Sequence, residues 1–136
     1  NPVYNNQIIS NFSQSKNIAG LAEATFGKDS IENRNNYNTL GISLDYLVES
    51  NVIEKPNLIK IDVDGLEHKI LDGSVDTIAN DNVKSVLVEL NTNLEVHRKI
   101  VSHMKNFGFS LDQDQVEASI VKEGWNAGIG NHIFRR

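Results

Sequence analysis

Carboxylates crowd a short segment near the middle of the chain. Asp62, Asp64 and Glu67 follow an alternating apolar run within six residues, so their charges repel one another unless a cation, a proton or backbone donors are present. A carboxylate at the end of a strand can act as a general base, a metal ligand or a nucleophile. Because strand interiors seldom hold an acid for packing reasons, we predict a functional role for Asp62. Capping of nearby backbone N–H groups is its structural alternative.

The other two acids have a stronger structural alternative. The spacing from Asp64 to Glu67 is that of a capping box, in which side chains accept hydrogen bonds from backbone amides at the start of a helix. We predict that both side chains contact such amides. A role in a site stays open beside capping, because a helix N-terminus also stabilises anions.

Two further charges interrupt apolar strands. Lys60 and Glu89 each stand in a run of aliphatic residues, and neither charge is expected to be buried alone. If the strands are neighbours, Lys60 would neutralise Glu89 or Asp62, either as a structural ion pair or within a site. Asn91 and Asn93 follow the second run, where they either bind a ligand through their amides or form a turn.

A glycine-rich stretch near the end of the chain holds two weaker candidates. Gly128-Ile129-Gly130 precedes a strand instead of joining a strand to a helix, so it is weak evidence for a phosphate loop. Trp125 either stacks on a ligand or shields the rim of the core.

Composition excludes several function classes. With 136 residues and a hydrophobic share of 39%, the chain is predicted to form a single domain, residues 1–136, with one core. A net charge of −5 without a basic stripe argues against nucleic acid as a partner, and no apolar run reaches the ~20 residues that span a membrane. The absence of Cys fits a reducing, cytoplasmic compartment, and the four histidines lack ligand spacing, so no metal site is predicted.

Hydrophobic periodicity predicts an α/β fold. Residues 1–38 are Asn-rich and read as loops with short strands at most, whereas Ser43 is a good N-cap for a helix over Leu44–Val48. Beyond them we expect parallel strands at 58–63 and 84–90, helices at 66–79 and 94–107, and terminal strands at 109–111 and 131–135. The first helix should break near Gly73, and the apolar second strand should be covered on both faces. The terminal strands should pair antiparallel, because no helix is expected between them.

A family resemblance rests on one long segment. The stretch TLGISLDYLVESNVIEKPNLIKIDVDGLEHKILDGS, followed by VKSVLVELN, resembles the FkbM-type methyltransferases, which show a strand ending in T-L-D, then K-I-D-V-E-G-x-E, x-x-L-x-G and a strand ending in V-E. The matching residues are Leu44, Asp45, Lys60, Asp62, Asp64, Gly65, Glu67, Leu71, Gly73 and Glu89. Asp64 stands where the family more often has Glu.

The resemblance implies a Rossmann-like, S-adenosylmethionine-dependent methyltransferase that acts on hydroxyl groups of small molecules or sugars. The family's glycine-rich cofactor loop has no counterpart here, so we expect the chain to be the C-terminal half of the domain, an excerpt without the cofactor-binding first half. Under this hypothesis Asp62 is the base or contacts the cofactor, with Asp64 and Glu89 as further catalytic acids. Lys60, Glu67 and Asn91 would bind the acceptor.

Alternatives from other classes stay open. Asp62-Val63-Asp64-Gly65 is also similar to the D-x-D-G motif of haloacid-dehalogenase-type phosphatases, where Asp62 would be the nucleophile, Asp64 the acid/base and magnesium the cofactor. Leu66 replaces the Thr of that motif. A non-catalytic α/β binding module is a third hypothesis. We also expect self-association through an uncovered edge of the 58–63 strand.

Overall fold

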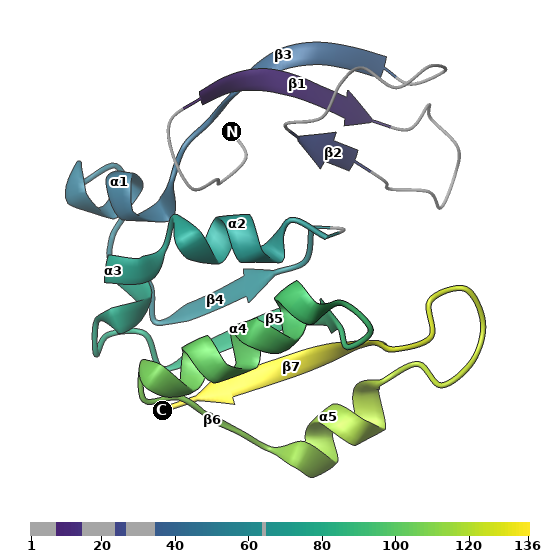
Figure 1. Cartoon of the computed structure of the whole chain (residues 1–136). Helices are drawn as coiled ribbons and strands as arrows, with labels where there is room; N and C mark the ends of the chain where they lie inside the picture. Colours follow the sequence, from purple (N-terminus) through teal and green to yellow (C-terminus); the bar gives the residue numbers. More distant parts are fainter. Residues whose placement is uncertain (1–7, 15–23, 27–34, 64) are drawn as a thin grey trace.

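The computed structural model describes residues 8–14, 24–26, 35–63 and 65–136, which form two sheets and five helices (Figure 1). The first sheet is antiparallel, with strands β1 (Ile8–Gln14), β2 (Ala24–Phe26) and β3 (Asn35–Gly41) in the order β2-β1-β3. The second has the order β4-β5-β7-β6.

The first sheet corrects the expectation of loops over residues 1–38. β1 and β3 pair along seven residues each, from Ile8 opposite Gly41 to Gln14 opposite Asn35. The rings of Phe12 and Tyr37 lie 5.2 Å apart across the strands, and the buried Ser13 hydroxyl lies within hydrogen-bonding distance of side-chain oxygens of Asn11 and Asn36, with one proton to donate between them. These strands are stabilised by pairing between polar residues that lie far apart in the sequence. The prediction of loops rested on the turn preference of Asn, which is local and does not detect such pairing.

The second sheet confirms the central βαβ prediction. β4 (Leu58–Ile61) runs parallel to β5 (Ser85–Asn91), with Ile61 opposite Val88. β6 (Ser110–Leu111) and β7 (Ile129–Arg135) pair antiparallel as expected, and β7 is also antiparallel to β5.

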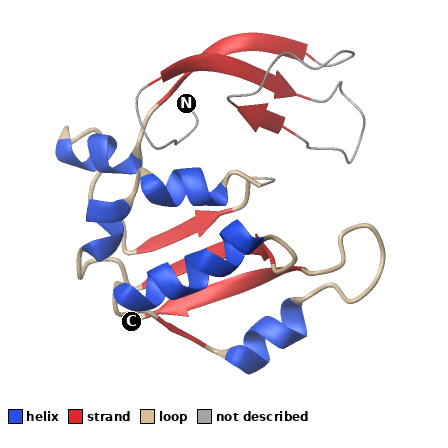
Figure 2. Ribbon diagram, viewed as in Figure 1, coloured by secondary structure: helices blue, strands red, loops and turns tan. Residues whose placement is uncertain are grey.

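Helices cover one face of this sheet (Figure 2). α2 (Glu67–Asp72) and α3 (Val75–Ala79) follow β4 and are separated at Gly73, as predicted, and α4 (Glu95–Asn106) follows β5. Their apolar side chains pack on alternate residues of the strands, forming a core of Ile61, Leu71, Ile78, Val83, Val86, Val88, Leu90, Ile100, Met104, Phe109 and Phe134.

The prediction that β5 is covered on both faces is wrong. Val86, Val88 and Leu90 are buried, whereas the intervening residues, from Ser85 to Asn91, are half-buried. β4 is the edge strand of the sheet as described, and Leu58 on it is 72% exposed.

Two helices flank the strands more loosely. α1 (Leu44–Glu49) begins at the predicted N-cap, where the Ser43 hydroxyl accepts from the Tyr46 N–H. α5 (Gln113–Ser119) lies between β6 and β7, where no helix was expected. Val116 is its single buried residue, and Gln115 binds β7 through the Ile133 N–H and the Asn131 carbonyl. A helix held by side-chain amides lacks the apolar stripe that would reveal it.

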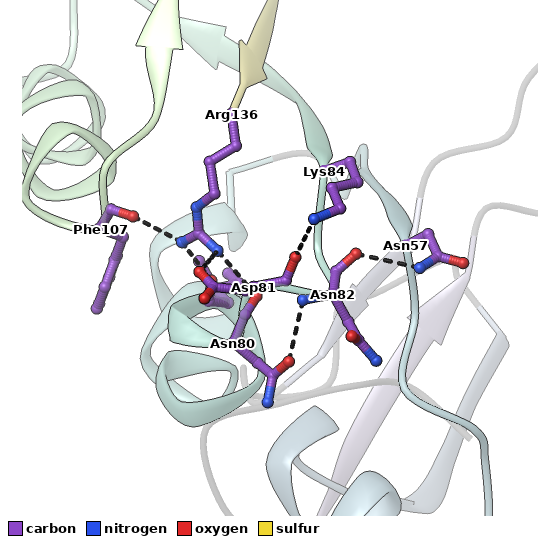
Figure 3. A network of polar contacts seen from close by, with 8 residues as sticks. Asn57, Asn80, Asp81, Asn82, Lys84, Phe107 and Arg136 are labelled. Carbon is purple, nitrogen blue, oxygen red and sulfur yellow. Dashed lines mark hydrogen bonds and ion pairs between the residues drawn. The ribbon is translucent and has the colours of Figure 1, made fainter.

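Arg136 binds several backbone carbonyls at one end of the sheet (Figure 3). This end is the one opposite the carboxyl ends of β4 and β5. The Arg136 guanidinium donates to the carbonyls of Ile78, Asn80 and Phe107 and lies 4.2 Å from the centre of the Phe109 ring. Three carbonyls at the C-terminal ends of α3 and α4 therefore share one cation.

Candidate active site

The carboxyl ends of β4 and β5 bring several of the predicted site residues to one face. Lys60 lies opposite Leu87, and Ile61 lies opposite Val88. Continuing the alternation by one residue places Asp62 beside Glu89, on the face opposite the core. Ligands of open α/β sheets bind outside the carboxyl ends of parallel strands, so this face has the right position for chemistry.

Asp62 is the accessible carboxylate of this face. Its Oδ2 lies 3.0 Å from Lys60 Nζ, and the two side chains are 42% and 65% exposed. Lys60 therefore pairs with Asp62, which is one of the two partners predicted for it. An exposed pair of this kind adds little stability, so the carboxylate remains available to other ligands.

The polar residues at the end of β5 form a turn. The Asn91 side-chain oxygen accepts from the Asn93 N–H at 2.9 Å, and the Asn91 N–H donates to His97 Nδ1. The predicted turn is therefore present. Glu89, two residues before Asn91 on β5, is half-buried and lies opposite Asn131 of β7.

Glu67 lies inside the protein, which corrects the prediction that it binds the acceptor. Its side chain is 2% exposed, and Oε1 accepts from the backbone N–H groups of Val63 and Gly65 at 3.3 and 3.1 Å. Glu67 does accept from backbone amides, but these precede α2 and belong to the loop after β4, so the predicted contact with amides at the start of the helix is wrong for Glu67. Asp64, for which we predicted capping and catalysis, lies outside the described residues.

His97 completes this buried arrangement and was missed in the sequence. Its Nε2 lies 3.2 Å from Glu67 Oε2, without the alignment of a hydrogen bond, while Nδ1 accepts from Asn91. Because burial disfavours the imidazolium, the pKa of His97 is lowered, against the opposing effect of the Glu67 charge. The spacing of His97, Ile100 and Met104 is that of one helical face, a signal that could have identified it. Val96, next to His97 in the chain, is 39% exposed and lies off that face.

Comparison with known families bears directly on this site. A family model described as the methyltransferase FkbM domain matches residues 4–111. The chain belongs to the FkbM methyltransferase domain family. Neither a search of curated proteins nor a search of solved structures gives a significant match. The family match gives the phosphatase alternative no support.

Several residues of the FkbM-type motif meet in space. The Asp45 N–H donates to the Gly73 carbonyl at 3.1 Å, and the Asp45 carboxylate accepts from the N–H groups of Asp76 and Thr77 at 3.1 and 2.8 Å. Asp45 thereby caps α3 at the point where Gly73 breaks the helix. This part of the motif has a structural explanation.

A methyltransferase of this family requires a methyl donor. The groove along β4, of about 380 Å³, is large enough for part of a nucleoside, but Lys60 is the single polar side chain among its lining residues, which are otherwise Leu44, Pro56, Leu58, Ile59, Ile61, Val63 and Ile70. A donor with ribose hydroxyls and a carboxylate needs several polar partners, so these residues do not fit it. Within the described ranges, no group of three His, Cys, Asp or Glu is arranged to hold a metal ion, and no helix is long and apolar enough to cross a membrane.

Proposed function

We propose that this chain supplies the acceptor side of an S-adenosylmethionine-dependent O-methyltransferase, with a hydroxyl of a small molecule or sugar as the acceptor. The observation that carries the proposal is the accessible Asp62 carboxylate at the carboxyl end of β4 in a member of the FkbM family. The strand order and directions around it fit a Rossmann-like methyltransferase sheet. Residues other than those lining the β4 groove would bind the donor.

Asp62 is the residue we assign as general base. Methyl transfer to a hydroxyl requires loss of the hydroxyl proton, and a carboxylate within hydrogen-bond reach of that hydroxyl can accept it. Lys60 Nζ lies 3.0 Å from the Asp62 carboxylate and can hold it in place. Glu89 and Asn91, on the same face at the next strand end, would orient the acceptor.

Glu67 acts on this site as a positioning residue. By accepting from Val63 and Gly65, it fixes the backbone on the C-terminal side of Asp62. His97 Nε2 lies 3.2 Å from the other carboxylate oxygen, and His97 Nδ1 accepts from the Asn91 N–H, so this pair lies between the ends of β4 and β5. A carboxylate base must be held within a fraction of an ångström of its productive place, which a buried anchor of this kind provides.

A transfer assay tests the proposal. The natural polypeptide that contains this segment is incubated with methyl-labelled S-adenosylmethionine and a panel of hydroxylated acceptors, including methyl glycosides. We expect label in an O-methyl product and stoichiometric S-adenosylhomocysteine. Release of inorganic phosphate from phosphate esters instead, or donor binding without turnover of any acceptor, would favour the alternative classes.

A further inference from the structure

Trp125 is unusually exposed for a tryptophan in an ordered loop. At 93% exposure it is the most accessible of the large hydrophobic residues described, ahead of Ile9 at 75% and Leu58 at 72%. A side chain this accessible does not shield the rim of the core, so that alternative is wrong. A tryptophan combines a large apolar face with a polar N–H, which is why this residue type is enriched at binding interfaces.

Hydrogen bonds close the loop that carries Trp125 at its base. The Gly128 N–H donates to the Val121 carbonyl, and the Val121 N–H donates to the Ile129 carbonyl, both at 2.8 Å. Within the loop, the Ala127 N–H donates to the Gly124 carbonyl at 3.2 Å. The loop over residues 121–128 therefore has a defined shape, which limits the entropy that Trp125 would lose on binding a ligand.

The same loop is fastened to the turn after β5. The Thr92 N–H and hydroxyl both donate to the Gly128 carbonyl, at 2.8 and 3.0 Å, and the Asn93 side-chain amide donates to the Ala127 carbonyl at 2.8 Å. Gly128 has a φ of +89°, and a Cβ there would overlap the Asn93 side chain. The loop thus projects from the carboxyl end of β5, at the same end of the sheet as the loop after β4 (Figure 1).

We propose that Trp125 binds the ring of an uncharged sugar, stacking its indole against the C–H face of that ring. The inference rests on the proposed function for its biological meaning, because the loop lies at the end of the sheet that holds Asp62. It also lies outside residues 4–111, so it belongs to a part of the chain that the family model does not match. An acceptor preference that depends on Trp125 would therefore be a property of this chain and not of the matched family domain.

Charge and polarity around the loop favour a neutral polyhydroxylated ligand. Between residues 112 and 126 the chain carries Asp112, Asp114, Glu117 and Glu123 against Lys122, so an anionic sugar would be repelled. Asn126, which follows Trp125 in the chain, carries an amide that can both donate to and accept from hydroxyl groups, and the Asn93 amide is bound to the same loop through the Ala127 carbonyl. An aromatic face beside neutral amides matches the amphipathic surface of a sugar ring.

The chain offers a direct readout, because Trp125 is its single tryptophan. Residues 1–136 are titrated, without methyl donor, with methyl glycosides of hexoses and 6-deoxyhexoses while indole fluorescence and its quenching by acrylamide are recorded. We expect a blue shift and protection from acrylamide that saturate with a Kd of ~1 mM for at least one glycoside. Glucose 6-phosphate tests the charge requirement and should bind more weakly than the neutral glycoside.

Variants assign the binding to this side chain. By titration calorimetry, Trp125→Ala should weaken the best glycoside about tenfold or more, and Trp125→Phe should retain part of the affinity. Tyr46→Ala is the matched control, since Tyr46 is 46% exposed on α1, and it should leave binding unchanged. Gly128→Ala, which disturbs the loop base, should weaken binding although Trp125 is intact.

Two results would overturn the inference. One is a fluorescence signal that no neutral glycoside changes, or that a charged sugar changes at lower concentration. The other is unchanged glycoside affinity in Trp125→Ala. Because no donor is present, glycoside binding in a protein that transfers no methyl group would refute the proposed function and leave this inference standing.

Discussion

Glu67 Oε2 and His97 Nε2 lie 3.2 Å apart in the core, with both side chains 3% exposed. The other oxygen of Glu67 holds the loop after β4, and the other nitrogen of His97 holds the end of β5. One buried pair therefore links the ends of both parallel strands, next to the proposed base.

Removing this carboxylate should destabilise the protein. Glu67→Ala leaves the Val63 and Gly65 N–H groups and the His97 ring without their partner, so we expect a loss of about 3 kcal/mol in the free energy of unfolding by urea titration. Glu67→Gln, which keeps an acceptor oxygen, should lose less. Glu95→Gln is the control, because Glu95 pairs with Lys99 on the surface and should change stability by less than ~0.5 kcal/mol. An equal effect of Glu67→Ala and Glu95→Gln would show that the buried pair is not an anchor.

Stability should fall as the solution becomes mildly acidic. Burial lowers the pKa of both His97 and His132 below the ordinary value of 6.5. The unfolded chain then binds more protons than the folded one between the folded pKa and 6.5, so the stabilisation is complete above 6.5 and is lost as the pH falls below it. Chemical unfolding at a series of pH values measures this slope. His97→Gln should flatten it, whereas His103→Gln, on the exposed side of α4, should leave it unchanged.

Asp62 is the residue whose chemistry the proposed function depends on. Asp62→Asn keeps the shape of the side chain and removes its basicity, so methyl transfer by the natural polypeptide should fall by ~10²–10⁴. Lys60→Gln removes the exposed partner and should have a much smaller effect on kcat. Full turnover in Asp62→Asn would reduce Asp62 to a structural role or to contact with the donor.

The open edge of β4 should make residues 1–136 associate when expressed alone. A parallel strand with an exposed apolar edge offers unpaired backbone groups to another chain, and Leu58 lies on it at 72% exposure. Light scattering should detect species larger than the monomer, and Leu58→Lys should reduce them at little cost in stability.

We also expect titration calorimetry to show negligible binding of S-adenosylmethionine. A monodisperse monomer with micromolar donor affinity would contradict both expectations.

Arg136 should contribute strongly to stability despite its place at the end of the chain. Arg136→Ala removes hydrogen bonds from a charged donor to three carbonyls and the contact with Phe109, so we expect a loss of about 2 kcal/mol in thermal or urea unfolding. Arg136→Lys keeps the charge without the planar fork and should recover only part of it. Arg135→Ala, an exposed neighbour, is the control.

The sequence predicted those elements whose signal is local. Alternation located β4 and β5, the N-cap Ser43 located α1, and Gly73 marked the break between α2 and α3. β1 and β3 depend on pairing between residues far apart, as in Ser13 with Asn36, and α5 is held by the amides of Gln115. Neither leaves a hydrophobic period that could be recognised in the chain.

The site was predicted by residue type but not by orientation. Asp62, Lys60 and Glu89 could be placed on one side of the sheet from alternation alone. Glu67 looked similar to Asp62 in the sequence, and only the fold turns it inward to meet His97, thirty residues later. Which of several neighbouring acids faces solvent depends on the turn after the strand, and a positive φ at Gly65 sets that turn.

The bond between Asp45 and Gly73 joins two positions of the family signature that lie far apart in the sequence. The Asp45 carboxylate caps α3 just beyond the break at Gly73, so a substitution of Asp45 would leave the N–H groups of Asp76 and Thr77 without this acceptor. The signature therefore records how the scaffold is assembled, and proteins that methylate different molecules can share it unchanged. Under the inference drawn for Trp125, the choice of acceptor depends on a loop that lies outside the residues matched by the family model.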